Sequence, residues 1–157
     1  NEMWNQLDGL TGLLSQKSYL NRTLNQRPED RMLIVLDLDD FKYINDTYGH
    51  LAGDRCLREI AGCLKKAYSR YGNCYRIGGD EFVIILPESG KAEFEEQMEQ
   101  VQEDLKQAHI SYSMGLEWKK EGMLESMLKA AEQRMYAEKN AYYKLRGRDR
   151  RCPERSV

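Results

Sequence analysis

The chain has 157 residues, of which 41% are hydrophobic and 32% are charged, and its formal net charge is -2. This length favours one domain with a sizeable core, and the small net charge gives no electrostatic attraction to nucleic acid or to anionic membranes. No apolar run approaches the roughly 20 residues that span a bilayer and no signal peptide precedes the fold, so we expect a cytoplasmic domain.

The four cysteines show no spacing typical of a metal site. Cys56 and Cys63 fall on one expected helix, which indicates small core residues in a reducing compartment. The chain begins at Asn1 without an initiator methionine. We therefore expect a piece of a longer protein, which can itself be anchored in a membrane.

The first half of the chain alternates helical and strand patterns. The apolar pattern predicts a short helix over 15–26, followed by a continuous apolar run at 32–36 that is typical of a strand buried on both faces. Apolar residues at helical spacing predict an amphipathic helix over roughly 51–69. A β-hairpin over 74–86 follows, with two glycines and two acids at its tip.

The second half repeats this alternation. It predicts a charged helix over 91–108, a strand over 110–117 and a last helix from 124 to about 145. The order after the first helix is β-α-β-β-α-β, which predicts a ferredoxin-like or palm-type α/β fold, an α+β sandwich with extra helices. Its central sheet is expected to be mostly antiparallel and flanked by helices.

Three carboxylates are expected to meet at one edge of this sheet. A right-handed β-α-β crossover makes the second strand parallel to the first, so the end of the first strand lies on the same edge as the hairpin tip. Asp37 would then approach Asp80 and Glu81. Such acids repel one another unless a cation compensates, and Mg²⁺ is commonly held by a few carboxylates together with substrate phosphates.

Strand-end acids that face an acidic hairpin are the arrangement of polymerase-type palms, which use metals in phosphoryl transfer. A solvated acidic turn with a helix-capping aspartate explains the same residues without a metal. The spacing of the acids alone leaves both interpretations open.

Two motifs resemble a known family. The hairpin tip reads Gly78-Gly79-Asp80-Glu81-Phe82, and residues 37–54 read DLDDFKYINDTYGHLAGD. These motifs resemble the GGDEF family, the diguanylate cyclases of bacterial signalling, whose second motif is D-x-D-x-F-K-x-x-N-D-x-x-G-H-x-x-G-D. We therefore expect a GGDEF domain over 1–150 and a disordered tail over 151–157.

Three further stretches extend the resemblance over nearly the whole chain, in order. Residues 8–16 are similar to the family's opening D-x-L-T-G-L-x-N-R, and residues 111–118 to its late S-x-G strand. Residues 130–139 are similar to its A-D-x-A-L-Y-x-A-K helix, with Glu132 in place of the usual aspartate.

The resemblance implies a reaction. Two GTP molecules condense in a head-to-tail homodimer to give cyclic di-GMP and two pyrophosphates, because each 3′-hydroxyl attacks the α-phosphate of the opposing nucleotide. The implied cofactor is Mg²⁺, for which Mn²⁺ can substitute. The resemblance also implies an N-terminal sensory or dimerising domain in the parent chain, and neither nucleic acid nor direct membrane contact for this domain.

The same resemblance implies roles for the acids. Asp37, the Leu38 carbonyl and Asp80 would bind Mg²⁺, and Glu81 would be a further carboxylate that can join the metals. Asp80 or Glu81 would also serve as the catalytic base for the 3′-hydroxyl. Activation of that hydroxyl by the metal is the alternative.

Asn45 and Asp54 match the family's guanine-binding residues. A carboxylate accepts hydrogen bonds from the guanine N1–H and 2-amino group together, and adenine lacks this donor pair. A turn or capping role is the alternative for both residues. The other substrate-binding residues implied by the resemblance are Phe41, Lys42, His50, Gly78, Gly79 and Lys139.

Two stretches depart from the family. Members with product inhibition carry R-x-x-D before the double glycine, where this chain reads Ser69-Arg70-Tyr71-Gly72, so we expect that inhibitory site to be absent. The Gly-Arg pair that often follows the lysine of the last helix comes late, at Gly147-Arg148. The intact hairpin favours an active cyclase over the alternative, a catalytically silent GGDEF domain that binds GTP or a protein partner.

Overall fold

The computed structural model of the protein describes residues 6–24, 31–87, 91–119 and 124–145. In these residues the strands form one four-stranded sheet of order β2-β3-β1-β4, in which every neighbouring pair is antiparallel. The strands are β1 (Arg31–Leu38), β2 (Asn73–Arg76), β3 (Glu81–Pro87) and β4 (Tyr112–Lys119). This is the predicted mostly antiparallel β-α-β-β-α-β arrangement, and the prediction of the fold class is confirmed.

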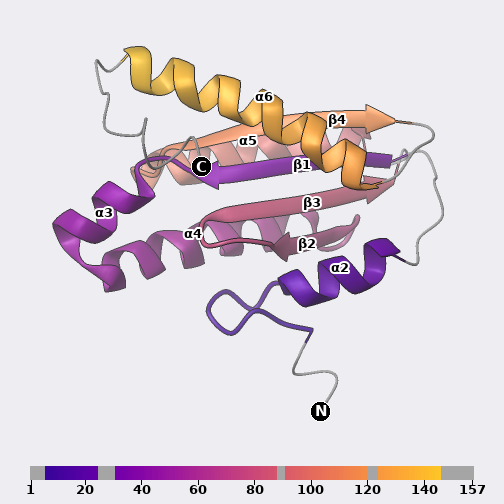
Figure 1. Ribbon diagram of the computed structural model, residues 1–157, viewed down its shortest axis with the longest axis horizontal. Helices are drawn as coiled ribbons and strands as arrows, with labels where there is room; N and C mark the ends of the chain where they lie inside the picture. The colour runs from indigo at the N-terminus through magenta and orange to yellow at the C-terminus, as the bar shows by residue number, and fades with distance from the viewer. Residues whose placement is uncertain (1–5, 25–30, 88–90, 120–123, 146–157) are drawn as a thin grey trace.

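Helices cover both faces of the sheet (Figure 1). α4 and α5 lie on one face, α2 and α6 on the other, and α3 lies beyond the end of β1. The helices of the described residues are α2 (Gln16–Leu24), α3 (Phe41–Tyr48), α4 (His50–Tyr68), α5 (Lys91–Gln107) and α6 (Leu124–Leu145).

β1 is the central strand. All eight of its residues are buried, because β3 and β4 pair with its two edges and helices cover its two faces. Side chains of a strand alternate between faces, so Leu33 and Val35 pack under α6 while Ile34 and Leu36 pack toward α4 and α5. Asp37 therefore follows the apolar stripe on the α6 face.

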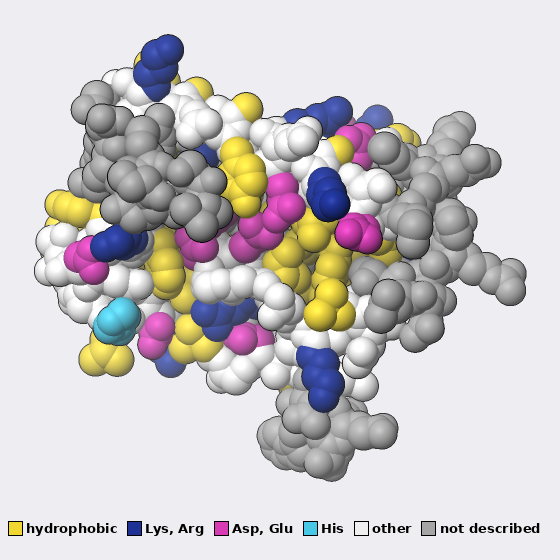
Figure 2. All heavy atoms as spheres, in the orientation of Figure 1, with side chains coloured by type: hydrophobic (Ala, Val, Ile, Leu, Met, Phe, Trp, Pro, Cys, Tyr) yellow, Lys and Arg dark blue, Asp and Glu magenta, His cyan; other side chains and the backbone are white. Residues whose placement is uncertain are grey.

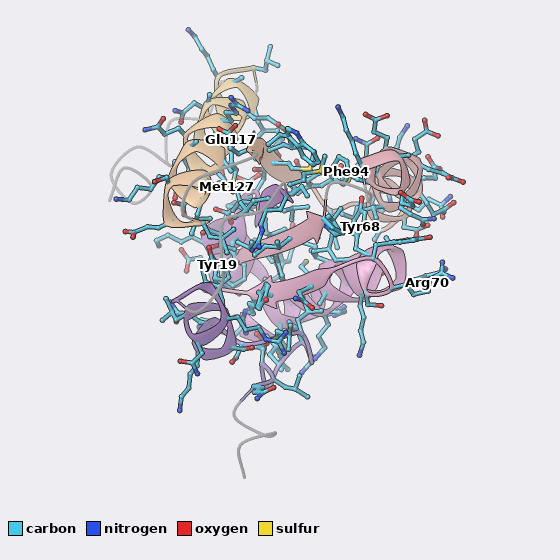
Figure 3. The ribbon with its side chains drawn as sticks, turned by 90° about the vertical axis from the view of Figure 1, so that its right-hand side faces the viewer. Tyr19, Tyr68, Arg70, Phe94, Glu117 and Met127 are labelled. Carbon is cyan, nitrogen blue, oxygen red and sulfur yellow. The ribbon has the colours of Figure 1, made fainter. Side chains whose placement is uncertain are left out.

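An aromatic side chain marks each core (Figure 3). The rings of Tyr68 in α4 and Phe94 in α5 are stacked, with centroids 5.7 Å apart. On the opposite face, Tyr19 of α2 packs in the same cluster as Met127 of α6. Burying each such side chain stabilises the fold by about 1.5–3 kcal/mol, so the two cores fix the sheet that carries the acids.

The boundaries differ from the sequence-based ones in a few places. β4 begins and ends two residues later than predicted, and Gly49, with φ of 93°, separates α3 from α4. The end of the first predicted helix (25–26), the Gly147-Arg148 pair and the predicted tail (151–157) lie outside the described residues. Among the helices described, none combines the length and the apolar composition that a membrane span requires.

Candidate active site

The structure brings the expected acids together at the end of β1. Asp37 is the β1 residue that pairs with Glu81 of β3 across the antiparallel ladder. The backbone N–H of Leu38 donates to the carbonyl of Asp80 at 3.2 Å, so the hairpin tip is hydrogen-bonded to this end of the strand. Acidic side chains gather toward the centre of the face on which α6 lies (Figure 2).

Asp37 is buried and incompletely paired. Its side chain is 9% exposed, and its Oδ1 has no hydrogen-bond partner among the described residues. The pKa of Asp37 is raised to about 9, mainly by burial and then by the hydrogen bond with Asp80 and the negative charge of Asp80, while the Lys139 ammonium partly opposes this rise. A buried carboxyl with a free oxygen and a raised pKa is suited to a cation that would replace its proton.

Glu81 shares this environment. The pKa of Glu81 is raised to about 8, mainly by burial and then by its hydrogen bond with Glu132 of α6 and the negative charges of Glu132 and Asp80. A group with such a pKa exchanges protons near neutral pH, which general acid–base chemistry requires. In the sequence Glu132 is only a departure from the family motif, and its contact with Glu81 was not predicted.

Lys139 of α6 lies inside the acidic cluster. Its ammonium is buried, donates to the Leu38 carbonyl and to Asp39 Oδ1 at 3.0 Å each, and lies 3.8 Å from Asp37 Oδ2. A buried ammonium requires such partners, because an unpaired one is very costly. Lys139 therefore supplies a fixed positive charge beside the residues expected to bind metal.

Asp39 holds this lysine and was missed by the sequence analysis. Its carboxylate accepts hydrogen bonds from Ser111 and Ser113 hydroxyls at 2.7 Å each, in addition to the one from Lys139. Asp39 is only 2% exposed. The same carboxylate thus connects the start of β4, the end of β1 and α6.

The last turns of α6 also fix the loop between β1 and α3. Asp40 adopts a left-handed conformation, with φ of 61°, just before α3. Its N–H donates to the Tyr143 hydroxyl at 2.8 Å, and the Tyr142 hydroxyl donates to its Oδ2 at 3.0 Å. The last turns of α6 therefore hold the backbone that follows Asp37 in place.

The hairpin tip is supported from the N-terminal turn. The Arg76 guanidinium donates to the Gly79 carbonyl at 2.7 Å and forms an ion pair with Asp8 at 3.2 Å. Burial tends to raise the pKa of Asp8, but hydrogen bonds from Thr11 and the nearby Arg76 hold it below its usual value. The tip is thereby tied to the turn that carries the family's opening motif.

The fold itself does not require the two glycines of the tip. Neither Gly78 nor Gly79 has a positive φ. A Cβ on Gly78 would only reach ordinary contact with Glu81 at 3.6 Å, and a Cβ on Gly79 would meet no atom within 4 Å. The space beside both residues is therefore open to a ligand.

The residues expected to bind guanine lie on two adjoining helices. Asn45 is on α3 and Asp54 on α4, and both are half-buried. Asn45 Oδ1 is buried with no hydrogen-bond partner in the described part of the chain. Phe41, at the start of α3, is half-buried and packs against the core.

Lys42 and His50 lie farther out. The Lys42 ammonium is exposed and pairs with Asp46 at 2.8 Å, one helical turn along α3. His50 is exposed at the first position of α4. Their expected substrate contacts stay predictions, as do those of the other substrate-binding residues.

A family model described as "Diguanylate cyclase, GGDEF domain" matches residues 5–144. The chain belongs to the GGDEF family. This confirms the family named from the hairpin and the 37–54 motif.

The GGDEF domain is similar to characterised proteins over most of its length. Diguanylate cyclase VdcA of Vibrio cholerae is 32% identical over 161 residues, which cover 93% of this chain and 46% of VdcA. The GGDEF domain of DgcB from Caulobacter crescentus, solved in complex with c-di-GMP, is 26% identical with a TM-score of 0.73. That match covers 91% of this chain and 92% of the DgcB chain.

A second solved structure includes a partner protein. Diguanylate cyclase SiaD from Pseudomonas aeruginosa, in complex with its activator SiaC, is 25% identical with a TM-score of 0.76, over 89% of this chain and 61% of that chain. The chain spans less than half the length of the curated relatives it matches.

The acidic cluster of this GGDEF domain fits Mg²⁺ by its donor set. Among the described residues, no three His, Cys, Asp or Glu side chains form a ready-made metal centre. Mg²⁺ does not need one, because it keeps several waters and is commonly completed by substrate phosphates. The free Oδ1 of Asp37 and the Leu38 carbonyl beside it are oxygen donors of the kind that such an ion takes. The raised pKa of the Asp37 carboxyl means that a cation would replace its proton.

Proposed function

We propose that this domain is a diguanylate cyclase that condenses two GTP molecules into cyclic di-GMP and two pyrophosphates. The observation that carries the proposal is the pairing of Asp37 with Glu81, next to Asp80, in a cluster that retains a buried, unpaired carboxylate oxygen. The family and the similarity to a GGDEF domain solved with c-di-GMP support it.

Asp37, the Leu38 carbonyl and Asp80 would hold Mg²⁺, or Mn²⁺ in its place, with Glu81 as a further ligand. When bound, the ion supplies charge neutralisation at the triphosphate and lowers the pKa of a coordinated hydroxyl. Lys139 keeps the Leu38 carbonyl in place and adds a positive charge toward the phosphates. Asp39 keeps Lys139 there.

The remaining residues would orient the nucleotide. Asn45 and Asp54 accept hydrogen bonds from guanine, and the open space beside Gly78 and Gly79 admits the triphosphate. Phe41 and Lys42 place the first backbone N–H groups of α3 toward the phosphates, where the helix dipole favours negative charge. His50 lies on the adjoining helix and would contact the same substrate.

The chemical step joins two half-sites. The 3′-oxygen of one GTP attacks the α-phosphorus of the other, the bond from that phosphorus to the bridging oxygen breaks, and pyrophosphate leaves with its electron pair. The 3′-hydroxyl proton passes to a hairpin carboxylate or to solvent, and the pKa of about 8 suits Glu81 to accept it. Each chain binds one GTP, so a homodimer is needed for turnover.

Regulation would come from outside the domain. The GGDEF matches form part of longer relatives, and SiaD was solved with an activator protein, so we infer that a further domain or partner brings two copies face to face. A GTP-consuming signalling enzyme of this kind acts in the bacterial cytoplasm.

The test is to incubate the purified domain with GTP and Mg²⁺ and to separate the nucleotides by chromatography. We expect cyclic di-GMP and pyrophosphate in a ratio of one to two, and no dinucleotide from the folded Asp80→Ala and Glu81→Ala variants. GTP that binds without conversion would instead identify a silent GGDEF module. No binding of GTP at all would refute the proposal.

A further inference from the structure

Gly53 lies directly beneath the side chain of Asn45. Gly53 is buried in the first turn of α4, where residues of α3 pack against it. A Cβ at this position would stand 1.9 Å from Asn45 Oδ1, 2.9 Å from Asn45 Cγ and 3.1 Å from Phe41 Cε1. The Asn45 amide thus occupies the space that any other residue at position 53 would fill.

The backbone does not explain this glycine. The glycines with positive φ in the described part of the chain are Gly12 and Gly49, so Gly53 has a conformation open to every residue. Alanine stabilises the interior of a helix more than glycine does. The atoms nearest to an added Cβ are the ends of side chains, which can move without unfolding the helix. The missing side chain of Gly53 therefore allows the observed position of Asn45 and does not stabilise α4.

The position of Asn45 leaves its oxygen ready for a ligand. Asn45 Oδ1 is buried and accepts no hydrogen bond from any described residue. A buried acceptor without a donor is costly, so its pairing on ligand binding is favourable. The guanine 2-amino group and the adjacent N3 present one donor and one acceptor side by side, which match the oxygen and the NH₂ of an amide.

We propose that Gly53 is a specificity-determining residue. Because it has no side chain, it leaves space for the Asn45 amide at the position where this amide can recognise the 2-amino group of guanine. This inference rests on the proposed function, because it names how the nucleotide site selects its base. Gly53 touches no substrate itself and acts through Asn45, so it is a positioning residue.

The experiment compares Gly53→Ala with Gly62→Ala. Gly62 lies in the same helix, is exposed, and has no atom within 4 Å of an added Cβ, so its alanine variant controls for the change in helix propensity. Steady-state KM and kcat are measured with GTP and with ITP, which differs from GTP only by the missing 2-amino group. Thermal unfolding is recorded for each variant.

We expect Gly53→Ala to raise KM for GTP by about tenfold or more, the effect of losing one good hydrogen bond to a buried group, with a smaller effect on kcat. Its preference for GTP over ITP falls toward that of Asn45→Ala, while Gly62→Ala keeps the wild-type preference. The unfolding midpoint of Gly53→Ala stays at or above that of the wild type.

A double variant tests the route of the effect. In the Asn45→Ala background the amide is gone, so Gly53→Ala should produce no further change in KM or in base preference. A full additional loss in that background would mean that Gly53 acts by another route, and would overturn the inference. This comparison also holds if the single variant Gly53→Ala proves less stable than expected, because the Asn45 amide, which the new Cβ would meet first, is absent from both proteins of the Asn45→Ala background.

The outcomes separate the two proposals. If wild-type protein converts GTP but Gly53→Ala and Gly62→Ala have the same KM and base preference, the inference is wrong and the proposed function stands. If the domain binds GTP without converting it, dissociation constants for GTP and ITP replace KM in the same comparison. If neither wild type nor Gly62→Ala binds GTP, the proposed function fails, and the inference fails with it.

Discussion

In metal-free protein, the Asp37→Asn variant should gain stability relative to the wild type as the pH rises. Burial raises the pKa of Asp37 to about 9, whereas an aspartate in the unfolded chain titrates near its model value of 3.8. Between these two values the folded protein binds a proton that the unfolded chain has released. The free energy of unfolding therefore falls as the pH increases through this window, and the Asp37→Asn variant lacks this contribution.

The size of the effect follows from proton linkage. One extra proton held by the folded state changes the free energy of unfolding by about 1.4 kcal/mol per pH unit. From about pH 5.5 to about pH 7.5, Asp37 alone can account for a loss of up to about 2.7 kcal/mol. For a domain of this size, that loss corresponds to a decrease of about 5–10 °C in the unfolding midpoint. Glu81, with its pKa raised to about 8, adds a loss of the same sign.

The assay is urea unfolding followed by circular dichroism, at both pH values and with a chelator present. We expect the stability difference between Asp37→Asn and wild type to grow in favour of the variant as the pH rises. Glu95→Gln, at an exposed position of α5, is the matched control and should keep the wild-type pH dependence. Equal pH dependence for wild type and Asp37→Asn would refute the account of a buried, proton-holding carboxyl.

Three further predictions concern Lys139, the product and the dimer. Asp39→Asn should lower the free energy of unfolding, measured in urea, by about 2 kcal/mol and should reduce turnover, because the buried Lys139 ammonium loses the carboxylate of Asp39. Unchanged stability would contradict this. Cyclic di-GMP titrated calorimetrically should show no low-micromolar site. At the positions of the R-x-x-D motif, Ser69 offers only one hydroxyl, and a Cβ on Gly72 would stand 2.2 Å from the Ile85 carbonyl. Tight binding with inhibition would mean that other residues have rebuilt the site. Specific activity should rise with protein concentration, since each turnover needs two half-sites, and activity that stays flat over a hundredfold dilution would argue for a tight built-in dimer.

The sequence predicted those parts of the site that local patterns determine. The apolar run at 32–36 identified β1, and the hairpin signal placed Asp80 and Glu81 opposite its end. The crossover rule then predicted their approach to Asp37. These inferences succeed because strand pairing and register depend on the alternation and turn residues of short segments.

The contacts made by α6 could not be predicted in the same way. Lys139 and Leu38 are 101 residues apart in sequence, and their contact depends on how the helix packs across the sheet. Asp39 reads as one more acid in the DLDD run, and nothing local shows that Ser111 and Ser113 bond to it. Its role could have been suspected only from the cost of burying Lys139 without a partner.

The central claim is that the Asp37 cluster binds a divalent ion at the phosphates of GTP. It is tested most directly by crystals grown with Mn²⁺ and a GTP analogue whose α–β bridging oxygen is replaced by carbon, since that bond cannot release pyrophosphate. We predict an anomalous manganese peak within coordination distance of Asp37 and Asp80, and its loss in Asp37→Asn. A bound nucleotide whose metal lies away from both carboxylates would contradict the account.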